Sequence, residues 1–212
     1  SPSIRLRSGN LSLASSRLDA SSSTGDGGTI QLDGQFITLG GSQLLANSTF
    51  AGTTSGLGGS IHIGLNSQPL SPVVSINSSN LLANGVLDGG LVSLDGQTVN
   101  VSGGEINTSS TGTDPLATGG FIRIGTYTDA NNVQVGYLPD LVNLSNARLI
   151  ADPPSVGGRI SVNGVTVNIT QSLLNVTGST GGSLTVGSPS TTTLAFNGGS
   201  TQLLGSSSGA YT

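Results

Sequence analysis

The chain has 212 residues, of which 34 are glycine, and only 8% of its residues are charged, giving a formal net charge of −4. It has no cysteine, which excludes disulfides and thiolate metal ligands. Its six basic residues are all arginine and are scattered, so we expect no nucleic-acid partner, because phosphate binding needs a basic patch. No apolar run has the length of a transmembrane helix, so we expect no membrane insertion.

A Gly-Gly pair followed by an alternating apolar strand recurs along the chain. Ile4-Arg5-Leu6 is the first strand of this kind and lacks the glycines. Complete copies follow at nearly regular intervals, at Gly27–Leu32, Gly58–Ile63, Gly89–Leu94, Gly119–Ile124, Gly157–Val162 and Gly181–Val186. This order among the aliphatic residues argues against a disordered linker, of which glycine and serine richness alone would be typical. Each copy predicts a short strand with alternating inward and outward side chains.

Two more apolar triplets follow each copy and predict a second and a third strand. Second-strand triplets begin at Leu11, Ile37, Val74, Val99, Val142, Val167 and Leu194, and third-strand triplets begin at Leu18, Leu44, Leu81, Ile106, Leu149, Leu174 and Leu203. Three strands per coil predict an all-β fold, a right-handed, three-sided parallel β-helix (β-solenoid) of about seven coils. One coil buries too few aliphatics to offset the ordering of its backbone, so the coils must stack. We expect residues 1–212 to form a single β-helix segment, part of a longer solenoid or a subunit of a stacked fibre.

The corner after the first strand differs between alternate coils. In one kind of coil an Asx-Gly pair predicts a tight turn, at Asp33-Gly34, Asp95-Gly96 and Asn163-Gly164. In the other kind a glycine precedes a segment rich in proline, serine or asparagine, and these glycines are Gly64, Gly125 and Gly187. We expect such segments to project as loops, the longest from about residue 126 to residue 140.

The middle residues of the second strands predict a ladder of small polar groups on one outer face. This candidate binding face consists of Ser12, Thr38, Ser75, Asn100, Asn143 and Asn168. It could bind a glycan or a neighbouring rod, or the residues could simply suit a solvated sheet. Ice binding is disfavoured, because the array is not uniformly threonine.

The third strands predict an apolar stripe. Four of their middle residues are aliphatic and should point outward, namely Leu45, Leu82, Ile150 and Leu204. Exposed apolar patches often mark partner surfaces, so we assign this stripe to lateral packing. The alternatives are that loops cover it, or that the register differs by one residue and exchanges the faces.

The sequence offers little for catalysis. The ten acidic residues show no cluster of the kind that lyases or hydrolases on this fold need. His62 is the sole histidine, lies in the middle of a predicted strand and has no evident nucleophile partner. We therefore predict no catalytic residue, no metal site and no cofactor.

Two adjoining segments, Leu44–Phe50 and Ser55–Ile63, resemble the haemagglutination-activity repeats of filamentous-haemagglutinin-like exoproteins of two-partner secretion. In those repeats an apolar strand ends in small residues, passes through a turn rich in Ser, Thr and Phe, and continues into Gly-Gly and Ile-x-Ile. The resemblance covers most of the chain as repeats, and is sharp over residues 27–63. It implies an exported right-handed β-helix at the bacterial cell surface, associated with adhesion, aggregation or biofilm.

The leading hypothesis is a non-enzymatic, extracellular structural or adhesive rod of a bacterial surface protein or filament. Such a rod acts by multivalent display and by lateral or end-to-end packing, because stacked coils repeat weak contacts along one face. Its partners would be itself, neighbouring segments of the same protein, or surface glycans. Two alternatives remain open: a carbohydrate-active β-helix enzyme (polysaccharide lyase or hydrolase) and a passive spacer.

Overall fold

The structure is a computed structural model that describes residues 1–52, 55–64, 71–128, 134–197 and 202–204. Every regular element within these residues is a β-strand. The described residues contain no helix of the length and apolarity needed to span a bilayer. Seventeen strands join one sheet, and two short strands form a separate antiparallel hairpin.

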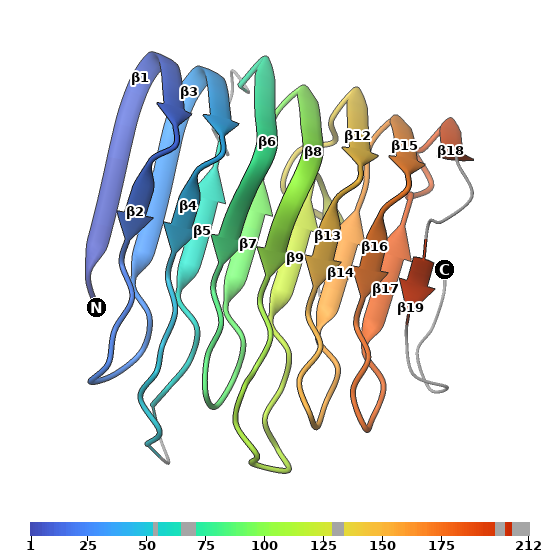
Figure 1. The fold of residues 1–212 in the computed structure, drawn as a ribbon. Coiled ribbons are helices and arrows are strands. Elements are labelled where there is room, and N and C mark those ends of the chain that lie inside the picture. The colour runs from blue at the N-terminus through green and yellow to red at the C-terminus, as the bar shows by residue number, and fades with distance from the viewer. Residues whose placement is uncertain (53–54, 65–70, 129–133, 198–201, 205–212) are drawn as a thin grey trace.

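The chain winds through about seven coils, each built mainly from two or three strands (Figure 1). The first four coils contain β1 (Ser3–Ala14) and β2 (Arg17–Asp19), β3 (Thr29–Gly40) and β4 (Gln43–Leu45), β5 (Ser60–Ile63) and β6 (Val73–Leu82), and β7 (Leu91–Leu94) and β8 (Thr98–Asn107). The last three contain β9 (Phe121–Ile124), β12 (Leu141–Ser145) and β13 (Arg148–Ile150), then β14 (Arg159–Val162), β15 (Thr166–Thr170) and β16 (Leu173–Asn175), and finally β17 (Ser183–Val186), β18 (Thr193–Asn197) and β19 (Gln202–Leu204). The predicted fold class, a parallel β-solenoid, is confirmed.

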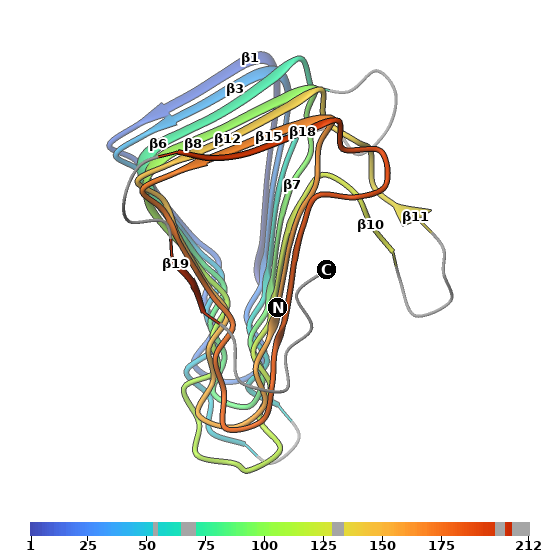
Figure 2. The same cartoon turned by 90° about the vertical axis from the view of Figure 1, so that its right-hand side faces the viewer.

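Each coil has three sides, as the view along the axis shows (Figure 2). The first side holds β5, β7, β9, β14 and β17, the second holds β12, β15 and β18, and the third holds β2, β4, β13, β16 and β19. Strands β1 and β3 bend across the corner between the first and second sides, and β6 and β8 bend across the next corner. In Figure 1 the chain rises on the far side and descends on the near side as it advances, which is the right-handed sense.

Inward-facing aliphatics stack in columns along the rod axis. On the second side Ile37 pairs with Val74, which pairs with Val99. On the first side Ile61 pairs with Val92. All five side chains are fully buried. Because each such burial contributes roughly 2 kcal/mol, the contacts between coils supply the stability that one coil lacks.

The corner between the second and third sides repeats one backbone conformation. One residue in each of six successive coils has a positive φ of 46° to 71°: Ser15, Gly41, Ser78, Gly103, Asn146 and Gln171. In several coils the next residue is a buried serine. The Ser79 hydroxyl accepts from the Ser42 amide at 3.0 Å, and the Ser172 hydroxyl accepts from the Ala147 amide at 3.1 Å. These serines satisfy buried amides that the turn removes from the strand ladder.

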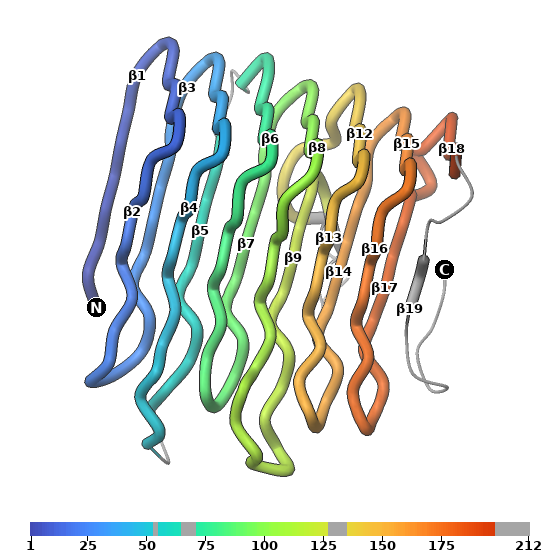
Figure 3. Tube along the Cα trace, viewed as in Figure 1, coloured from blue at the N-terminus to red at the C-terminus, as the bar shows by residue number. Residues whose placement is uncertain are grey.

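Beyond the third strand the chain comes close to the Gly-Gly pair that begins the next coil, and we call this narrow part of the coil the neck. Past the neck the chain opens into loops (Figures 2 and 3). At the neck the amide of Gly59 donates to the carbonyl of Ala46, and that of Gly90 donates to Ala83, both at 2.7 Å. A Cβ atom on either glycine would overlap backbone atoms of the preceding coil. The Gly-Gly pairs are therefore needed because two stretches of backbone approach each other too closely for side chains.

The first corner differs between alternate coils, as the sequence predicts, but the tight turn predicted at Asp33-Gly34 is wrong, because β3 continues through this pair. None of Gly34, Gly96 and Gly164 has a positive φ, and Gly34 is needed instead because a Cβ there would lie 2.8 Å from the carbonyl oxygen of Ser8. Gly64, Gly125 and Gly187 have φ values of 99°, 76° and 86°, which favour glycine. After Gly125 the chain leaves the coil in a hairpin of β10 (Tyr127–Thr128) and β11 (Gln134–Val135), which projects from the rod (Figure 2). The projecting segment predicted at about 126–140 is confirmed by this hairpin, although residues 129–133 lie outside the described part.

Candidate functional site

The second side carries the predicted ladder of small polar residues. Backbone pairing aligns all six in one row, namely Ser12, Thr38, Ser75, Asn100, Asn143 and Asn168. The row alternates with buried aliphatics, and its side chains are exposed or half-buried. The Asn143 amide nitrogen donates to the Asn100 oxygen at 2.8 Å, and that of Asn168 donates to Asn143 at 2.9 Å. Half of the row is thus an asparagine ladder whose side chains hold one another in place.

Two more outward rows flank this ladder. One row contains Asn10, Phe36, Val73, Thr98, Leu141, Thr166 and Thr193, and the other contains Ala14, Gly40, Asn77, Ser102, Ser145, Thr170 and Asn197. None of the residues in these three rows is charged. By contrast, the outward rows of the first side include Arg5, Arg123 and Arg159, and those of the third side include Arg17, Asp19, Glu105 and Arg148. We call the second side the uncharged face.

The stripe predicted on the third side is largely buried. The register is as expected, since Leu45 pairs with Leu82 and both lie in the row of Ile150. However, Leu45 is only 8% exposed and Ile150 only 7%, whereas Leu82 is half-buried. This row lies one residue before the neck, where the carbonyls of Ala46 and Ala151 accept from glycine amides. The predicted exposure is therefore wrong for Leu45 and Ile150, and the side chain of Leu204 lies outside the described part.

A long groove follows the Gly-Gly pairs along the neck. It has a volume of about 1070 Å³, and its lining extends from Gly27 in the first coils to Gly182 in the last. Its floor is glycine backbone. One wall consists of the residues that precede the pairs, Asp26, Leu57, Asp88 and Thr118, and the other of those that follow, Thr29, Ser60, Leu91, Phe121, Arg159 and Ser183.

The two acidic residues of the groove also hold the loops in place. Asp26 Oδ1 accepts from the amides of Gly56 and Leu57, at 2.9 and 3.1 Å. Asp88 Oδ1 accepts from the amide and the hydroxyl of Thr118, at 2.8 and 2.9 Å. Each carboxylate therefore fixes a turn of the following coil, and both remain half-buried at the groove wall.

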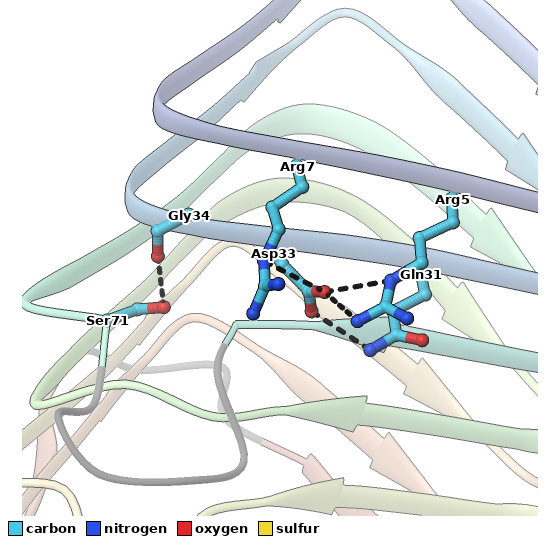
Figure 4. A network of polar contacts seen from close by, with 6 residues as sticks. All are labelled: Arg5, Arg7, Gln31, Asp33, Gly34 and Ser71. Atoms are coloured by element: carbon cyan, nitrogen blue, oxygen red, sulfur yellow. Dashed lines mark hydrogen bonds and ion pairs between the residues drawn. The ribbon is translucent and has the colours of Figure 1, made fainter.

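A polar network occupies the first corner of the second coil (Figure 4). Asp33 is 2% exposed, and its carboxylate accepts from Arg5 Nη2 at 2.8 Å and from Gln31 Nε2 at 3.0 Å. The Arg7 guanidinium also lies 4.0 Å from it. Asp33 therefore lies within a strand and not in the predicted turn, and its buried charge is paired, as buried charges require.

The same corner two coils further along contains a buried ion pair. Asp95 binds both terminal nitrogens of Arg123 from the next coil, with 2.7 Å between Nη1 and Oδ1, and the two residues are 2% and 8% exposed. Nearby, His62 Nδ1 lies 2.7 Å from the hydroxyl of Ser93. Burial, reinforced by the charge of Arg123, lowers the pKa of His62 below its ordinary value of 6.5. His62 therefore stays neutral at neutral pH.

The His62–Ser93 contact was missed at the sequence level, because the two residues meet only through the stacking of coils. A serine beside a histidine can serve as a nucleophile when its hydroxyl reaches a substrate. Ser93, however, is 1% exposed, and both Asp95 oxygens bind Arg123. Among the residues that the structure describes, no group of three or more potential metal ligands comes together.

Comparisons with protein-family models, with curated proteins and with solved structures found no match for this chain. The fold itself defines the class, a parallel β-solenoid built from repeats. No family match supports the resemblance to haemagglutination-activity repeats, which stays a prediction.

Proposed function

We propose that this chain forms part of a non-enzymatic, extracellular rod of a bacterial surface protein or filament, which acts by multivalent display and by packing against copies of itself. The observation that supports the proposal is the uncharged face. Three outward rows on one side of the rod carry no charge over about seven coils, whereas the other two sides carry arginine and acidic residues.

The composition of the uncharged face suits contact with a second copy. Cores of protein interfaces are depleted of charge, and two uncharged faces approach without repulsion or loss of charge hydration. Phe36, which is 48% exposed, shares an outward row with Val73 and Leu141 and offers apolar area. The asparagine ladder keeps the neighbouring row rigid, so little side-chain entropy is lost on contact.

The size of the uncharged face explains why repetition matters. Neighbouring coils are about 4.8 Å apart, and a strand rises about 3.3 Å per residue, so seven coils with strands of five residues give a face of roughly 500 Å². Stable interfaces bury about 800 Å² per partner, so one such contact is weak. Several weak contacts along a longer rod, or among several rods, combine into strong attachment. The resemblance of Leu44–Phe50 and Ser55–Ile63 to haemagglutination-activity repeats supports the same reading, with surface glycans as further candidate partners.

The proposal is tested by placing charge on one face at a time. Thr38 and Thr193 are exposed on the uncharged face, and Gln43 and Thr113 are exposed elsewhere. Thr38→Lys/Thr193→Lys and its control Gln43→Lys/Thr113→Lys change the net charge equally. Sedimentation velocity over rising concentration, with electron microscopy, should show lateral association of the native chain and of the control, and its loss in the first variant.

Two results would contradict the proposal. The native chain could stay monomeric at every concentration, which would favour the passive spacer. Alternatively, both double variants could associate equally, which would place the contact on another side of the rod.

A further inference from the structure

The groove along the neck has the shape of a site for a long, narrow ligand. Its lining includes the Gly-Gly pairs of six successive coils, so the groove runs across the strands and along the rod axis. The floor glycines Gly58, Gly89 and Gly119 are partly exposed. Because no side chain rises from the floor, a ligand can approach the backbone closely between the two walls.

An extended peptide does not fit this groove well. Peptides that bind sheets usually add a strand along an unpaired edge, through main-chain hydrogen bonds. The floor amides of Gly59, Gly90 and Gly120 already donate to carbonyls at the end of the third strand, each at 2.7 Å. The strands run across the groove, so their edges face neighbouring coils and not a ligand lying along it.

A polyanion is also disfavoured. Asp26 and Asp88 place two carboxylates on one wall, and the chain has a formal net charge of −4. Arg159 is the one basic side chain lining the described groove, and its guanidinium lies over the Phe121 ring, 4.9 Å from the centroid. Two acidic side chains against one basic one give the groove lining a small excess of negative charge, which disfavours a chain of acidic groups.

The walls instead suit sugars. Asp26 and Asp88 each accept from the backbone through Oδ1. Because a carboxylate has about four acceptor positions, both can still accept hydrogen bonds from ligand hydroxyls. Hydrogen bonds to a charged acceptor are about twice as strong as neutral ones. Leu57 and Leu91 supply apolar surface beside the hydroxyls of Thr29 and Ser60. Concave sites that mix apolar area with a few polar groups are typical of ligand pockets.

We propose that the groove binds an extended, neutral glycan chain that lies parallel to the rod axis. Six coils at about 4.8 Å span roughly 25 Å, so a chain of several sugars contacts several coils at once. Affinity should therefore rise with chain length, because each added contact is intramolecular. The proposal does not depend on the uncharged face, which lies on another side of the rod.

The test uses two groove variants and one matched control. Ser60→Trp fills the groove from an outward position of β5, and Asp88→Asn removes a charge but keeps an oxygen for the Thr118 amide. Gln43→Trp places the same indole at an exposed position of β4 on the third side, outside the groove. The 212-residue chain and each variant are titrated calorimetrically with hexamers of β-1,4-linked glucose, mannose and xylose, with the matching dimers, and with a galacturonate hexamer.

The proposal expects at least one neutral hexamer to bind, at least about tenfold more tightly than its dimer. Ser60→Trp and Asp88→Asn should each weaken this binding about tenfold or more, whereas Gln43→Trp should change it less than about twofold. Should Ser60→Trp fail to fold by circular dichroism, Asp88→Asn still decides the question. The proposal is overturned if no neutral hexamer binds, if the galacturonate binds more tightly, or if Gln43→Trp has the same effect as the groove variants.

Discussion

Gly90 lies at the neck, and replacing it with alanine tests why the Gly-Gly pairs recur. A Cβ at this position would overlap the carbonyl oxygen of Gly59 and stand only 2.8 Å from that of Ala83. Both neighbours are backbone atoms, so no side-chain rotation relieves the overlap. The neck must open, which strains the Gly90–Ala83 bond of 2.7 Å and the bond of 3.0 Å from the Leu91 amide to Gly59.

The size of the effect follows from these contacts. Each backbone hydrogen bond contributes about 1 kcal/mol net, and overpacking a tight site costs about 1–3 kcal/mol. We therefore expect Gly90→Ala to lower the free energy of unfolding by about 3–5 kcal/mol. This is a large share of the 5–15 kcal/mol that is typical of natural proteins.

Gly40 provides the matched control. It lies in β3, and a Cβ there would meet nothing within 4 Å. Gly40→Ala should be neutral or stabilising by about 0.5 kcal/mol, because it restricts the unfolded chain. Urea unfolding followed by circular dichroism measures both variants. If Gly90→Ala unfolds within about 0.5 kcal/mol of Gly40→Ala, the close approach at the neck is refuted.

Three further outcomes are expected from the polar contacts inside the rod. Stability should fall as the pH drops below about 6.5, because the unfolded chain then binds a proton that half-buried His62, with its lowered pKa, does not. Urea titrations of His62→Gln should show a smaller loss of stability, and an equal loss would count against this. Asp95→Asn should cost about 3 kcal/mol or more in the same assay, since it leaves the charge of Arg123 buried without its partner, and a cost under about 1 kcal/mol would disagree. Ser79→Ala should cost about 1–2 kcal/mol by leaving a buried amide without an acceptor, whereas Ser12→Ala on the exposed face should cost less than about 0.5 kcal/mol, and similar costs would argue against the serine column.

The stacking of the coils could be predicted from the aliphatic triplets, because the spacing of the triplets indicates which residues pair between neighbouring coils. Ile37, Val74 and Val99 each begin a second-strand triplet, and they lie beside one another in the structure. Alternation with a period of two then fixes which side chains point outward, so the row from Ser12 to Asn168 follows directly. Neighbours in this row lie far apart in the sequence, as Ser12 and Thr38 or Asn100 and Asn143 do, yet nothing beyond local pattern was needed to align them.

Surface shape could not be predicted in the same way. The burial of Leu45 and Ile150 depends on where the coil bends toward its neck, which no single triplet encodes. The groove likewise arises only when Gly-Gly pairs from six coils align, although their recurrence was the available signal. Asp26 and Asp88, at equivalent positions two coils apart, come to line one groove only in the folded rod.

The central claim is that rods meet through the uncharged face, and thiol protection tests it most directly. The chain has no cysteine, so Ser75→Cys on that face and Ser23→Cys in an exposed loop each introduce a single thiol. The rate of modification by a small thiol reagent is compared between dilute and concentrated protein. We predict that concentration slows the reaction of Ser75→Cys at least about tenfold and leaves Ser23→Cys unchanged. Equal rates for Ser75→Cys at both concentrations, under conditions where the rods associate, would contradict the account.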